Sequence, residues 1–201
     1  MVDGPDANER VVAAYESYAA EYARIVGTGP PPGSLAGLER LLVDLPAGAH
    51  VLEIGSGTGR DADVLEAHGV RVRRTDVTEA FLQQQRDRGL VAERLDVLCD
   101  DLGGPYDAVV ALATLIHVEH HRLGEVVAKI VAALDEDGLA LLSMREGEGA
   151  DEDREWFTAL WPRDRLEALY ADAGLDVVWH LAHDGRGTDR WNVHLLRRST
   201  R

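Results

Sequence analysis

The sequence predicts an α/β fold with a mostly parallel, seven-stranded sheet, helices on both faces and an antiparallel hairpin at the C-terminus. Three observations support this fold class. Strand-like and helix-like segments alternate from residue 50 onward, and such alternation favours a parallel sheet. A glycine-rich turn follows the first strand, and a glycine-rich loop without a helix joins the last two strands. Together these features indicate a Rossmann-like, doubly wound architecture.

Two helices are expected before the first strand. Apolar and tyrosine residues recur at helical spacing from Val11 to Tyr22, and a leucine stripe runs from Leu35 to Leu45. The prolines in segment 27–33 must interrupt any helix between them. The sequence therefore predicts a helical N-terminal cap with a short connector.

Strands and helices then alternate along the chain. Helices are expected from about Arg60, from about Glu79, from about Glu119 and over 163–173. The helix after Glu119 has an apolar face that extends to Leu134. The expected strands cover 50–54, 71–77, 92–99, 106–113, 139–144, 176–183 and 191–196.

The length and composition fit one domain. A chain of 201 residues with 45% hydrophobic residues is long enough for one buried core and short for two. We expect a single domain over 1–201. It consists of a helical cap (1–46), a cofactor-binding core (47–145) and a segment (146–201) with a lid, the last helix and the hairpin.

Charge and cysteine content exclude several functions. A net charge of −15 disfavours nucleic acid and anionic membranes as partners. No apolar run approaches the roughly 20 residues that span a bilayer, and the N-terminus lacks a signal-peptide pattern, so we expect a cytoplasmic protein. Cys99 is the only cysteine, which excludes an internal disulfide. Lys129 is the only lysine among 21 basic side chains, a bias typical of GC-rich bacterial coding.

The stretch HVLEIGSGTGRDADVLEAHG, residues 50–69, is typical of a strand, a tight turn and a helix that hold a nucleotide-like ligand. A dinucleotide fingerprint would need glycine where Arg60 stands. A P-loop would need lysine and then Ser or Thr where the chain has Arg60 and Asp61. Phosphate-binding patterns, and with them an NAD-dependent oxidoreductase, are therefore disfavoured.

The segment LEIGSGTGRD resembles the first motif of class I S-adenosylmethionine-dependent methyltransferases, an acidic residue followed by G-x-G-x-G. The resemblance extends loosely over 15–174 and favours the small-molecule branch. It implies S-adenosyl-L-methionine as cofactor, S-adenosyl-L-homocysteine as product, and Glu53 near the amino-acid end of the cofactor. Because this cofactor is a sulfonium without phosphate, an acidic residue beside the turn is tolerated where a pyrophosphate would be repelled. The alternative is a tight loop in another kind of α/β protein.

Asp76 stands about 20 residues after the glycines, at the end of the second strand, where an acidic side chain can accept hydrogen bonds from both ribose hydroxyls. Capping of the next helix is the alternative role, although Thr78 can also cap it. The resemblance implies a cofactor site formed by Tyr22, Glu53, Gly55, Ser56, Gly57, Gly59, Arg60, Asp76, Val77, Asp96, Val97 and Ala111.

The adenine end of the cofactor has competing candidates. The family has an acidic residue with an apolar neighbour near the end of the third strand, and Asp96 with Val97 is our choice here. Asp100 and Asp101 compete for this role.

Tyrosines on a helix before the core recur in the small-molecule branch. By resemblance, Tyr18 and Tyr22 would cover the cofactor or the substrate. Ordinary packing of an amphipathic helix explains them equally well.

His117 is the candidate general base. Methyl transfer is an in-line displacement, so positioning supplies much of the catalysis and a base is needed only for a hydroxyl-like acceptor. We expect His117 near a helix start, where the positive helix end favours the neutral imidazole; packing against the cofactor or helix capping are the alternatives. A metal site with Glu119, His120 and His121 is disfavoured because no second cluster supplies ligands, so no metal is expected.

Arg145 follows the fifth strand and is the second catalytic candidate. Its guanidinium could clamp an anionic substrate group, or pair with an acidic residue between Glu146 and Glu155. Glycines make this segment a candidate mobile lid. Trp156 and Trp161 either line a substrate pocket or pack in the core.

The sequence thus predicts an S-adenosylmethionine-dependent methyltransferase that acts on an oxygen or nitrogen of a small-molecule acceptor, as a monomer or homodimer. The acidic charge and the absence of an Asn/Asp-Pro-Pro-aromatic motif after the fourth strand disfavour nucleic acid as acceptor. The alternative is a non-catalytic S-adenosylmethionine-binding module that regulates or assembles with a protein partner.

Overall fold

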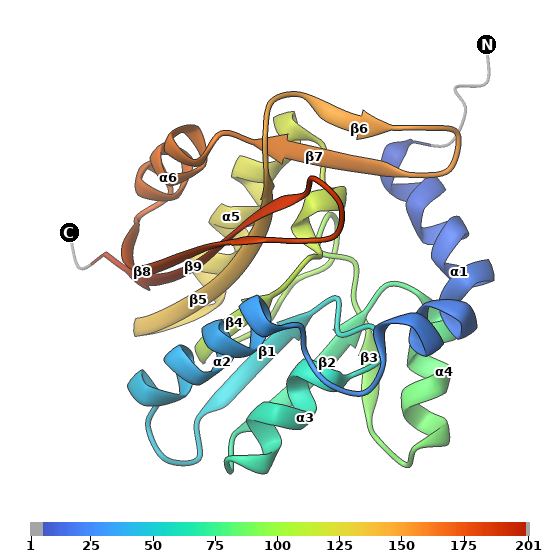
Figure 1. Ribbon diagram of the computed structural model, residues 1–201. Helices are drawn as coiled ribbons and strands as arrows, with labels where there is room; N and C mark the ends of the chain where they lie inside the picture. The colour runs from blue at the N-terminus through green and yellow to red at the C-terminus, as the bar shows by residue number, and fades with distance from the viewer. Residues whose placement is uncertain (1–5, 200–201) are drawn as a thin grey trace.

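The computed structural model describes residues 6–199 and has helices packed on both faces of one sheet (Figure 1). The helices are α1 (Ala7–Val26), α2 (Pro32–Asp44), α3 (Arg60–Ala67), α4 (Glu79–Asp87), the 3-10 turn η1 (Leu115–His117), α5 (His120–Ala133) and α6 (Arg163–Asp172). The strands are β1 (His50–Ile54), β2 (Arg71–Asp76), β3 (Ala92–Arg94), β4 (Tyr106–Ala111), β5 (Leu134–Glu146), β6 (Ala150–Glu152), β7 (Phe157–Trp161), β8 (Leu175–Asp184) and β9 (Arg190–Arg198).

The strand order confirms the predicted doubly wound sheet. Strands β3, β2, β1, β4 and β5 are neighbours in this order and run parallel, and β9 pairs antiparallel with both β5 and β8. The chain builds outward from β1 to β3 and then returns to place β4 on the other side of β1. Such a reversal leaves a crevice at the carboxyl ends of β1 and β4, where ligands bind in open α/β sheets.

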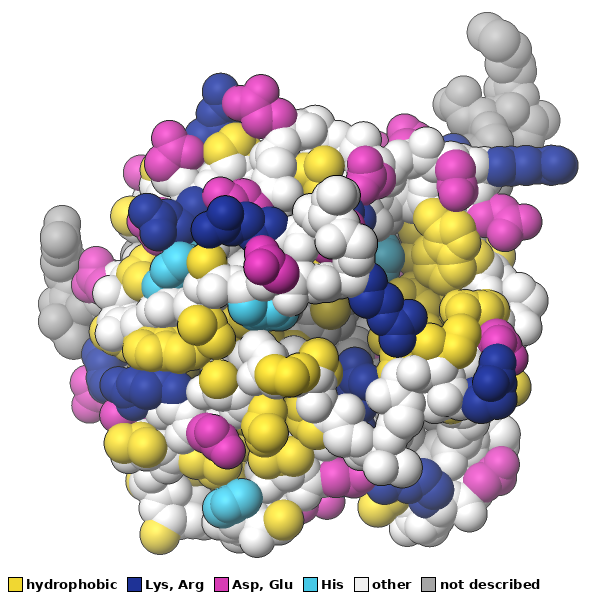
Figure 2. Space-filling view, viewed as in Figure 1, with side chains coloured by type: hydrophobic (Ala, Val, Ile, Leu, Met, Phe, Trp, Pro, Cys, Tyr) yellow, Lys and Arg dark blue, Asp and Glu magenta, His cyan; other side chains and the backbone are white. Residues whose placement is uncertain are grey.

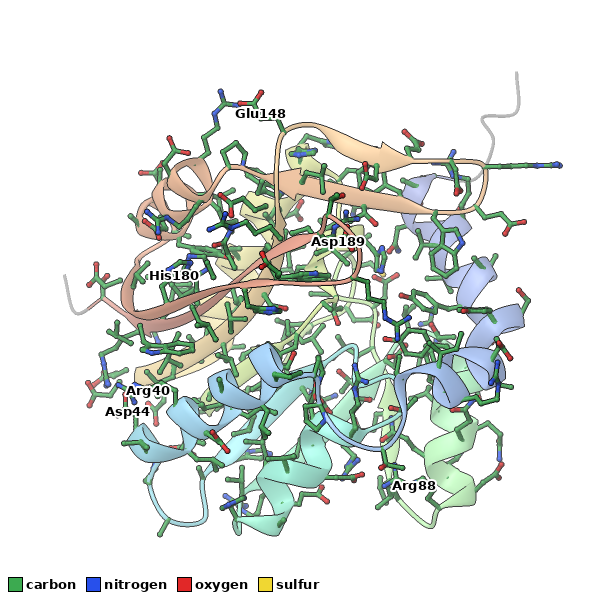
Figure 3. All side chains as sticks on the ribbon, in the orientation of Figure 1. Arg40, Asp44, Arg88, Glu148, His180 and Asp189 are labelled. Atoms are coloured by element: carbon green, nitrogen blue, oxygen red, sulfur yellow. The ribbon has the colours of Figure 1, made fainter. Side chains whose placement is uncertain are left out.

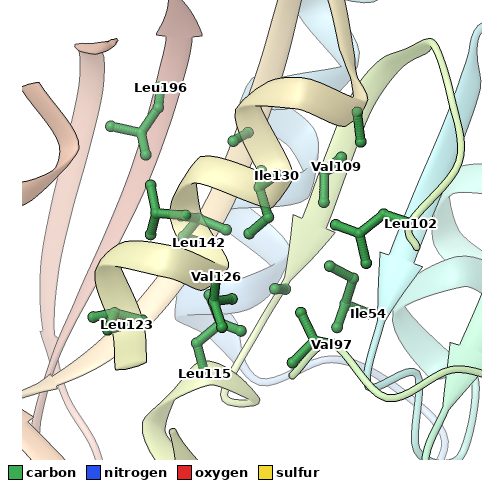
Figure 4. Close-up of a cluster of buried hydrophobic side chains, with 14 of the residues drawn as sticks. Ile54, Val97, Leu102, Val109, Leu115, Leu123, Val126, Ile130, Leu142 and Leu196 are labelled. Atoms are coloured by element: carbon green, nitrogen blue, oxygen red, sulfur yellow. The ribbon is translucent and has the colours of Figure 1, made fainter. Parts of the chain in front are cut away.

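Alternation along the strands divides the core into two layers. In β4, Ala108 and Val110 face the layer formed with α2 and α3, whereas Val109 and Ala111 face α5 and α6. Figure 4 shows part of the second layer, in which Val126 and Ile130 of α5 pack against the sheet. Each such fully buried aliphatic side chain stabilises the fold by about 1.5–3 kcal/mol.

The third strand is shorter than predicted, because it ends at Arg94 rather than near residue 99. The Asp96 carboxylate accepts a hydrogen bond from the backbone N–H of Leu98 at 2.9 Å, and the Asp96 carbonyl accepts one from Asp100 at 2.8 Å. These local bonds form a turn that replaces the strand ladder.

The fifth strand is longer than predicted. Helix α5 ends at Ala133, and Leu134, predicted on the helix, starts β5 and pairs with Tyr106 of β4. At its other end β5 runs past Ala111, the last residue of β4, and pairs there with β7.

Two strands within the predicted lid raise the strand number above seven. Strands β6 and β7 form an antiparallel hairpin, and the Asp153 carboxylate accepts backbone hydrogen bonds at 2.8 Å from both Glu155 and Trp156 in its turn. Phe157 and Ala159 of β7 pack against Ala7 and Val11 of α1. The hairpin thus joins the sheet to the N-terminal helix. In the described part of the chain, no helix is long and apolar enough to cross a membrane.

Candidate active site

A cavity of about 1020 Å³, counting its solvent-open part, lies at the carboxyl ends of β1, β2 and β4. Helix α1 covers it, and Figure 2 shows hydrophobic side chains gathered over this helix beside a hollow rimmed by basic side chains. The sequence-predicted residues that line the cavity are Tyr22, Gly55, Ser56, Gly57, Arg60, Asp76, Val77, Asp96, Val97 and His117.

The glycine turn approaches its neighbours too closely for larger residues. Gly55 has φ +69, and a Cβ there would lie 2.2 Å from Thr114 Oγ1. Gly59 has φ +82, and a Cβ there would lie 2.5 Å from a guanidinium nitrogen of Arg74. Gly59 therefore packs into the protein outside the cavity lining, and its role is to shape the turn.

A buried network holds the turn from beneath. The Arg74 guanidinium donates to the Gly59 carbonyl at 2.9 Å and pairs with Asp63 and Glu66, each at 2.7 Å. Gln85 donates to the Gly57 carbonyl at 2.9 Å. The turn carbonyls are satisfied on this side, so the cavity side of the turn remains available to a ligand.

Asp76 joins the glycine turn to the start of α4. One carboxylate oxygen accepts the backbone N–H of Gly57 and the other that of Thr78, both at 2.8 Å. Burial raises the pKa of Asp76, and these backbone bonds oppose the shift. Because each carboxylate oxygen can accept two hydrogen bonds, a ligand can still bind both oxygens. The geometry is compatible with the ribose role and with the helix-start role together.

Glu53, which is buried, and Asp61, which is half-buried and whose Oδ1 lies 3.9 Å from Nε of Arg60, are two acidic residues beside the turn. Within residues 6–199, Oε2 of Glu53 and Oδ1 of Asp61 are buried without a hydrogen-bond partner. Burial, followed by the charge of Asp61, raises the pKa of Glu53 well above its usual value. Burial likewise raises the pKa of Asp61 to about 6, against the lowering effect of Arg60. A cationic ligand group in the cavity could satisfy the Asp61 oxygen. Asp61 lines the cavity, whereas Glu53 lies behind its lining.

The residues considered for the adenine end of the cofactor differ in whether they line the cavity. Asp96 and Val97 line the cavity. Asp100 instead accepts the backbone N–H of Asp96 at 2.8 Å, and Asp101 accepts that of Gly103 at 2.8 Å, both outside the lining. Ala111 is also outside the lining, because its side chain points into the core layer of α5 and Leu112 to Thr114 line the cavity in its place.

The tyrosines of α1 divide between the cavity and its surroundings. Tyr15 and Tyr22 line the cavity and lie edge to face with ring centroids 5.6 Å apart. Tyr18 lies outside the lining, against Tyr22 and Trp156. Trp156 packs on Tyr15 at 4.8 Å, and Trp161 packs on the ring of His120, so neither tryptophan lines the cavity.

His117 is held in one tautomer. Its Nδ1 lies 2.8 Å from the carbonyl oxygen of Phe157, which can only accept, so Nδ1 carries the proton. Its Nε2 therefore accepts and lies 3.3 Å from the hydroxyl of Tyr15. His117 ends η1 before α5 begins, and burial rather than a helix end lowers its pKa. The neutral imidazole presents a basic nitrogen beside the cavity.

Arg145 pairs with two acidic residues outside the cavity lining. It forms ion pairs with Asp189 in the β8–β9 hairpin and with Asp151 of β6, the latter at 3.0 Å. Asp189 lies at the end of the β8–β9 hairpin (Figure 3). Of the two roles considered for Arg145, the structure shows the acidic pairing, and it places Arg145 outside the cavity lining. Arg145 ties two hairpins to β5.

Sequence reasoning missed Tyr15, Asp61 and Thr114 as cavity residues. Tyr15 belongs to the tyrosine stripe, but only its contact with His117 distinguishes it from Tyr18. Asp61 directly follows the glycine motif, and its position in the first helical turn was the available signal. Between residues 6 and 199, no three His, Cys, Asp or Glu side chains gather as a metal-binding cluster.

The fold, the glycine turn and the acidic residues at the strand ends define a class of α/β proteins that bind a nucleotide-like ligand at this crevice. Comparison with known families specifies the class. The model of the methyltransferase domain matches residues 33–180, well over half of the chain. The chain therefore belongs to this methyltransferase family. No curated protein sequence matches it.

Solved structures share the fold at low sequence identity. The 1,6-didemethyltoxoflavin-N1-methyltransferase of Burkholderia thailandensis, with bound 1,6-didemethyltoxoflavin and S-adenosylhomocysteine, is 19% identical, with a TM-score of 0.79 over 98% of this chain and 93% of that chain. Magnesium protoporphyrin IX methyltransferase of Synechocystis, with bound SAM, is 17% identical, with a TM-score of 0.76 over 99% and 100%. The cyclase SpnF is 13% identical, with a TM-score of 0.75 over 98% and 97%. A shared fold therefore does not determine the reaction.

Proposed function

We propose that this chain transfers a methyl group from S-adenosylmethionine to an oxygen or nitrogen of a small-molecule acceptor. The observation that carries this proposal is the pair of acidic residues at the glycine turn: Asp61 lines the cavity, Glu53 lies behind the lining, and each has a buried carboxylate oxygen without a hydrogen-bond partner within residues 6–199. A phosphate ligand would be repelled there, whereas the ammonium group of an amino-acid ligand would be bound. Two structural neighbours with bound S-adenosylmethionine or its product support this choice.

The residues around the cavity suit the parts of this cofactor. Asp76 would bind the ribose hydroxyls, and Asp96 with Val97 would contact the adenine. When bound, the cofactor supplies an electrophilic methyl group on a sulfonium, and its leaving group is a neutral thioether. Helix α1 covers the cavity, and its Tyr15 and Tyr22 side chains limit the entry of water.

His117 would act as the general base when the acceptor is a hydroxyl. Its neutral Nε2 can take the acceptor proton once the Tyr15 hydroxyl, 3.3 Å away, gives up its contact. The Phe157 carbonyl keeps Nδ1 protonated and so keeps Nε2 directed to the cavity. An amine acceptor that reacts as the free base needs no such step, so the effect of a His117 substitution distinguishes the two acceptor classes.

The test is calorimetric titration of the purified protein with S-adenosylmethionine, with S-adenosylhomocysteine and, as a control, with NAD. We expect the first two to bind and NAD not to bind. Mass spectrometry then screens small acceptors for the gain of one methyl group. Binding without transfer to any acceptor would favour the non-catalytic module, and absence of binding by a folded sample would contradict the proposal.

A further inference from the structure

Helix α1 and helix α4 form facing walls of the cavity. Tyr15 of α1 and Phe81 of α4 both line it, and their ring centroids are 5.6 Å apart. The residue after Tyr15 is Glu16, an exposed carboxylate that lies outside the lining. Glu16 is therefore placed to act on the enclosure of the cavity rather than on the ligand.

Glu16 binds the first turn of α4 from another element. Its two carboxylate oxygens accept the backbone N–H groups of Glu79, at 2.6 Å, and of Ala80, at 3.0 Å. The residue at the helix start, Thr78, makes no side-chain capping bond in the described structure. Free N–H groups at a helix start carry partial positive charge, so an exposed carboxylate stabilises them to a modest extent. Within residues 6–199, the side-chain hydrogen bonds to these two N–H groups come only from α1.

A second bond holds the C-terminal end of α1. The guanidinium of Arg60 donates to the carbonyl oxygen of Val26 at 3.2 Å, and Arg60 itself follows the glycine turn. The part of α1 that carries Tyr22 therefore lies between two attachments to the core, Glu16 and Val26. A ligand beneath this part of α1 can leave in two ways. Either the helix separates from at least one attachment, or the ligand passes beside the helix.

We propose that Glu16 is a positioning residue that holds α1 closed over the bound cofactor and thereby slows cofactor release. This proposal rests on the proposed function, because it takes S-adenosylmethionine as the ligand beneath α1. Loss of the carboxylate removes two charge-assisted hydrogen bonds that exist only when α1 contacts α4. The closed state is weakened, while the residues that contact the ligand are unchanged.

The experiment measures the rate at which methyl-tritiated S-adenosylmethionine leaves the full-length protein into excess unlabelled S-adenosylhomocysteine, without acceptor. We expect Glu16→Ala to accelerate release about three- to tenfold, in line with the loss of charge-assisted bonds at a helix start. Glu16→Gln retains one acceptor oxygen and should show a smaller acceleration. Glu21→Gln is the matched control, because Glu21 lies on the same helix and pairs only with Arg24 within the described chain.

A second measurement separates closure from simple stabilisation of α4. Hydrogen exchange of the S-adenosylmethionine complex should become faster in residues 14–26 of Glu16→Ala, and the thermal midpoint of the ligand-free protein identifies any general loss of stability. Equal release rates in wild type and Glu16→Ala would overturn the proposal for Glu16 and leave the proposed function intact. Failure of the wild type to bind S-adenosylmethionine would overturn both.

Discussion

At the scale of single residues, the candidate site depends on carboxylates that the fold removes from water. Asp76 is 6% exposed and already accepts two backbone hydrogen bonds, so its position is fixed before a ligand arrives. A pre-positioned acceptor loses little freedom on binding. Removal of the Asp76 carboxylate should therefore lower the affinity for the cofactor.

Asp76→Ala should weaken S-adenosylmethionine binding by about 1–3 kcal/mol, the effect of losing hydrogen bonds to a buried charged acceptor. Calorimetry gives the dissociation constant. Asp101→Ala is the matched control, because Asp101 bonds to the Gly103 N–H outside the cavity lining. An unchanged affinity in the Asp76 variant would remove this residue from the cofactor site.

His117→Asn should lower the rate of methyl transfer to a hydroxyl acceptor by about 10²–10⁴, as expected for loss of a general base. Because burial lowers the pKa of His117 below its usual 6.5, the imidazole is already neutral at pH 7. The wild-type rate should therefore rise with pH through a value below 6.5 and then level off. Initial rates across this range check both points, with the exposed His121→Gln as control. A wild-type rate in the Asn variant would assign His117 a packing role.

At the scale of elements, the glycine turn is held by side chains beneath it as much as by its own conformation. Gly59 and Gly69 have nearly the same φ, +82 and +81, but a Cβ at Gly59 would meet Arg74 while one at Gly69 would meet open space. A substitution at Gly69 therefore tests backbone strain alone. The same substitution at Gly59 tests backbone strain together with displacement of the Arg74 network.

Gly69→Ala should destabilise the protein by about 1–2 kcal/mol through left-handed backbone strain alone. Gly59→Ala should exceed this by about 1–3 kcal/mol, because it also displaces a buried, hydrogen-bonded guanidinium. Urea unfolding measures both values, and only Gly59→Ala should also weaken S-adenosylmethionine binding. Equal destabilisation by the two substitutions would show that the Arg74 network adapts without loss.

Local sequence patterns predict some features of the fold and the site, and other features depend on contacts between residues far apart in the sequence. The glycine turn and strand β4 follow from local patterns, and the structure confirms both. The β6–β7 hairpin was predicted as a lid without strands, because its packing depends on Ala7 and Val11, far away in the sequence. Tyr15 and Tyr18 are equivalent in a helical stripe, and only the folded position of His117 separates them. Long-range contacts therefore account for most of what the sequence could not predict.

At the scale of the whole molecule, the chain carries a net charge of −15, and the fold still places the buried carboxylate of Glu53 and the half-buried carboxylate of Asp61 at the candidate site. The folded pKa of Asp61, about 6, lies above its ordinary 3.8. The folded state thus binds the Asp61 proton more tightly than the unfolded state does. This contribution to stability is present below pH 3.8 and is lost as the pH rises through about 6. Glu53 acts in the same direction, since its pKa is raised too.

A bound cation should reverse this loss. The α-amino group of S-adenosylmethionine keeps most of its charge up to about pH 7. Its interaction with the acidic pair therefore strengthens as Asp61 ionises. Thermal unfolding should show a ligand-induced rise in midpoint that is larger at pH 7.0 than at pH 5.0.

Asp61→Asn should remove much of this pH dependence while keeping the shape of the site. Its ligand-induced shift should be similar at the two pH values, and Asp101→Asn should behave as the wild type. A wild-type shift that is the same at pH 5.0 and pH 7.0 would contradict ammonium binding by this pair. Asp61 Oδ1 has no hydrogen-bond partner within residues 6–199, and Nε of Arg60 lies 3.9 Å from it, so a proton or a cationic ligand group can complete the neutralisation of this carboxylate. The pH dependence therefore reports directly which of the two occupies the site.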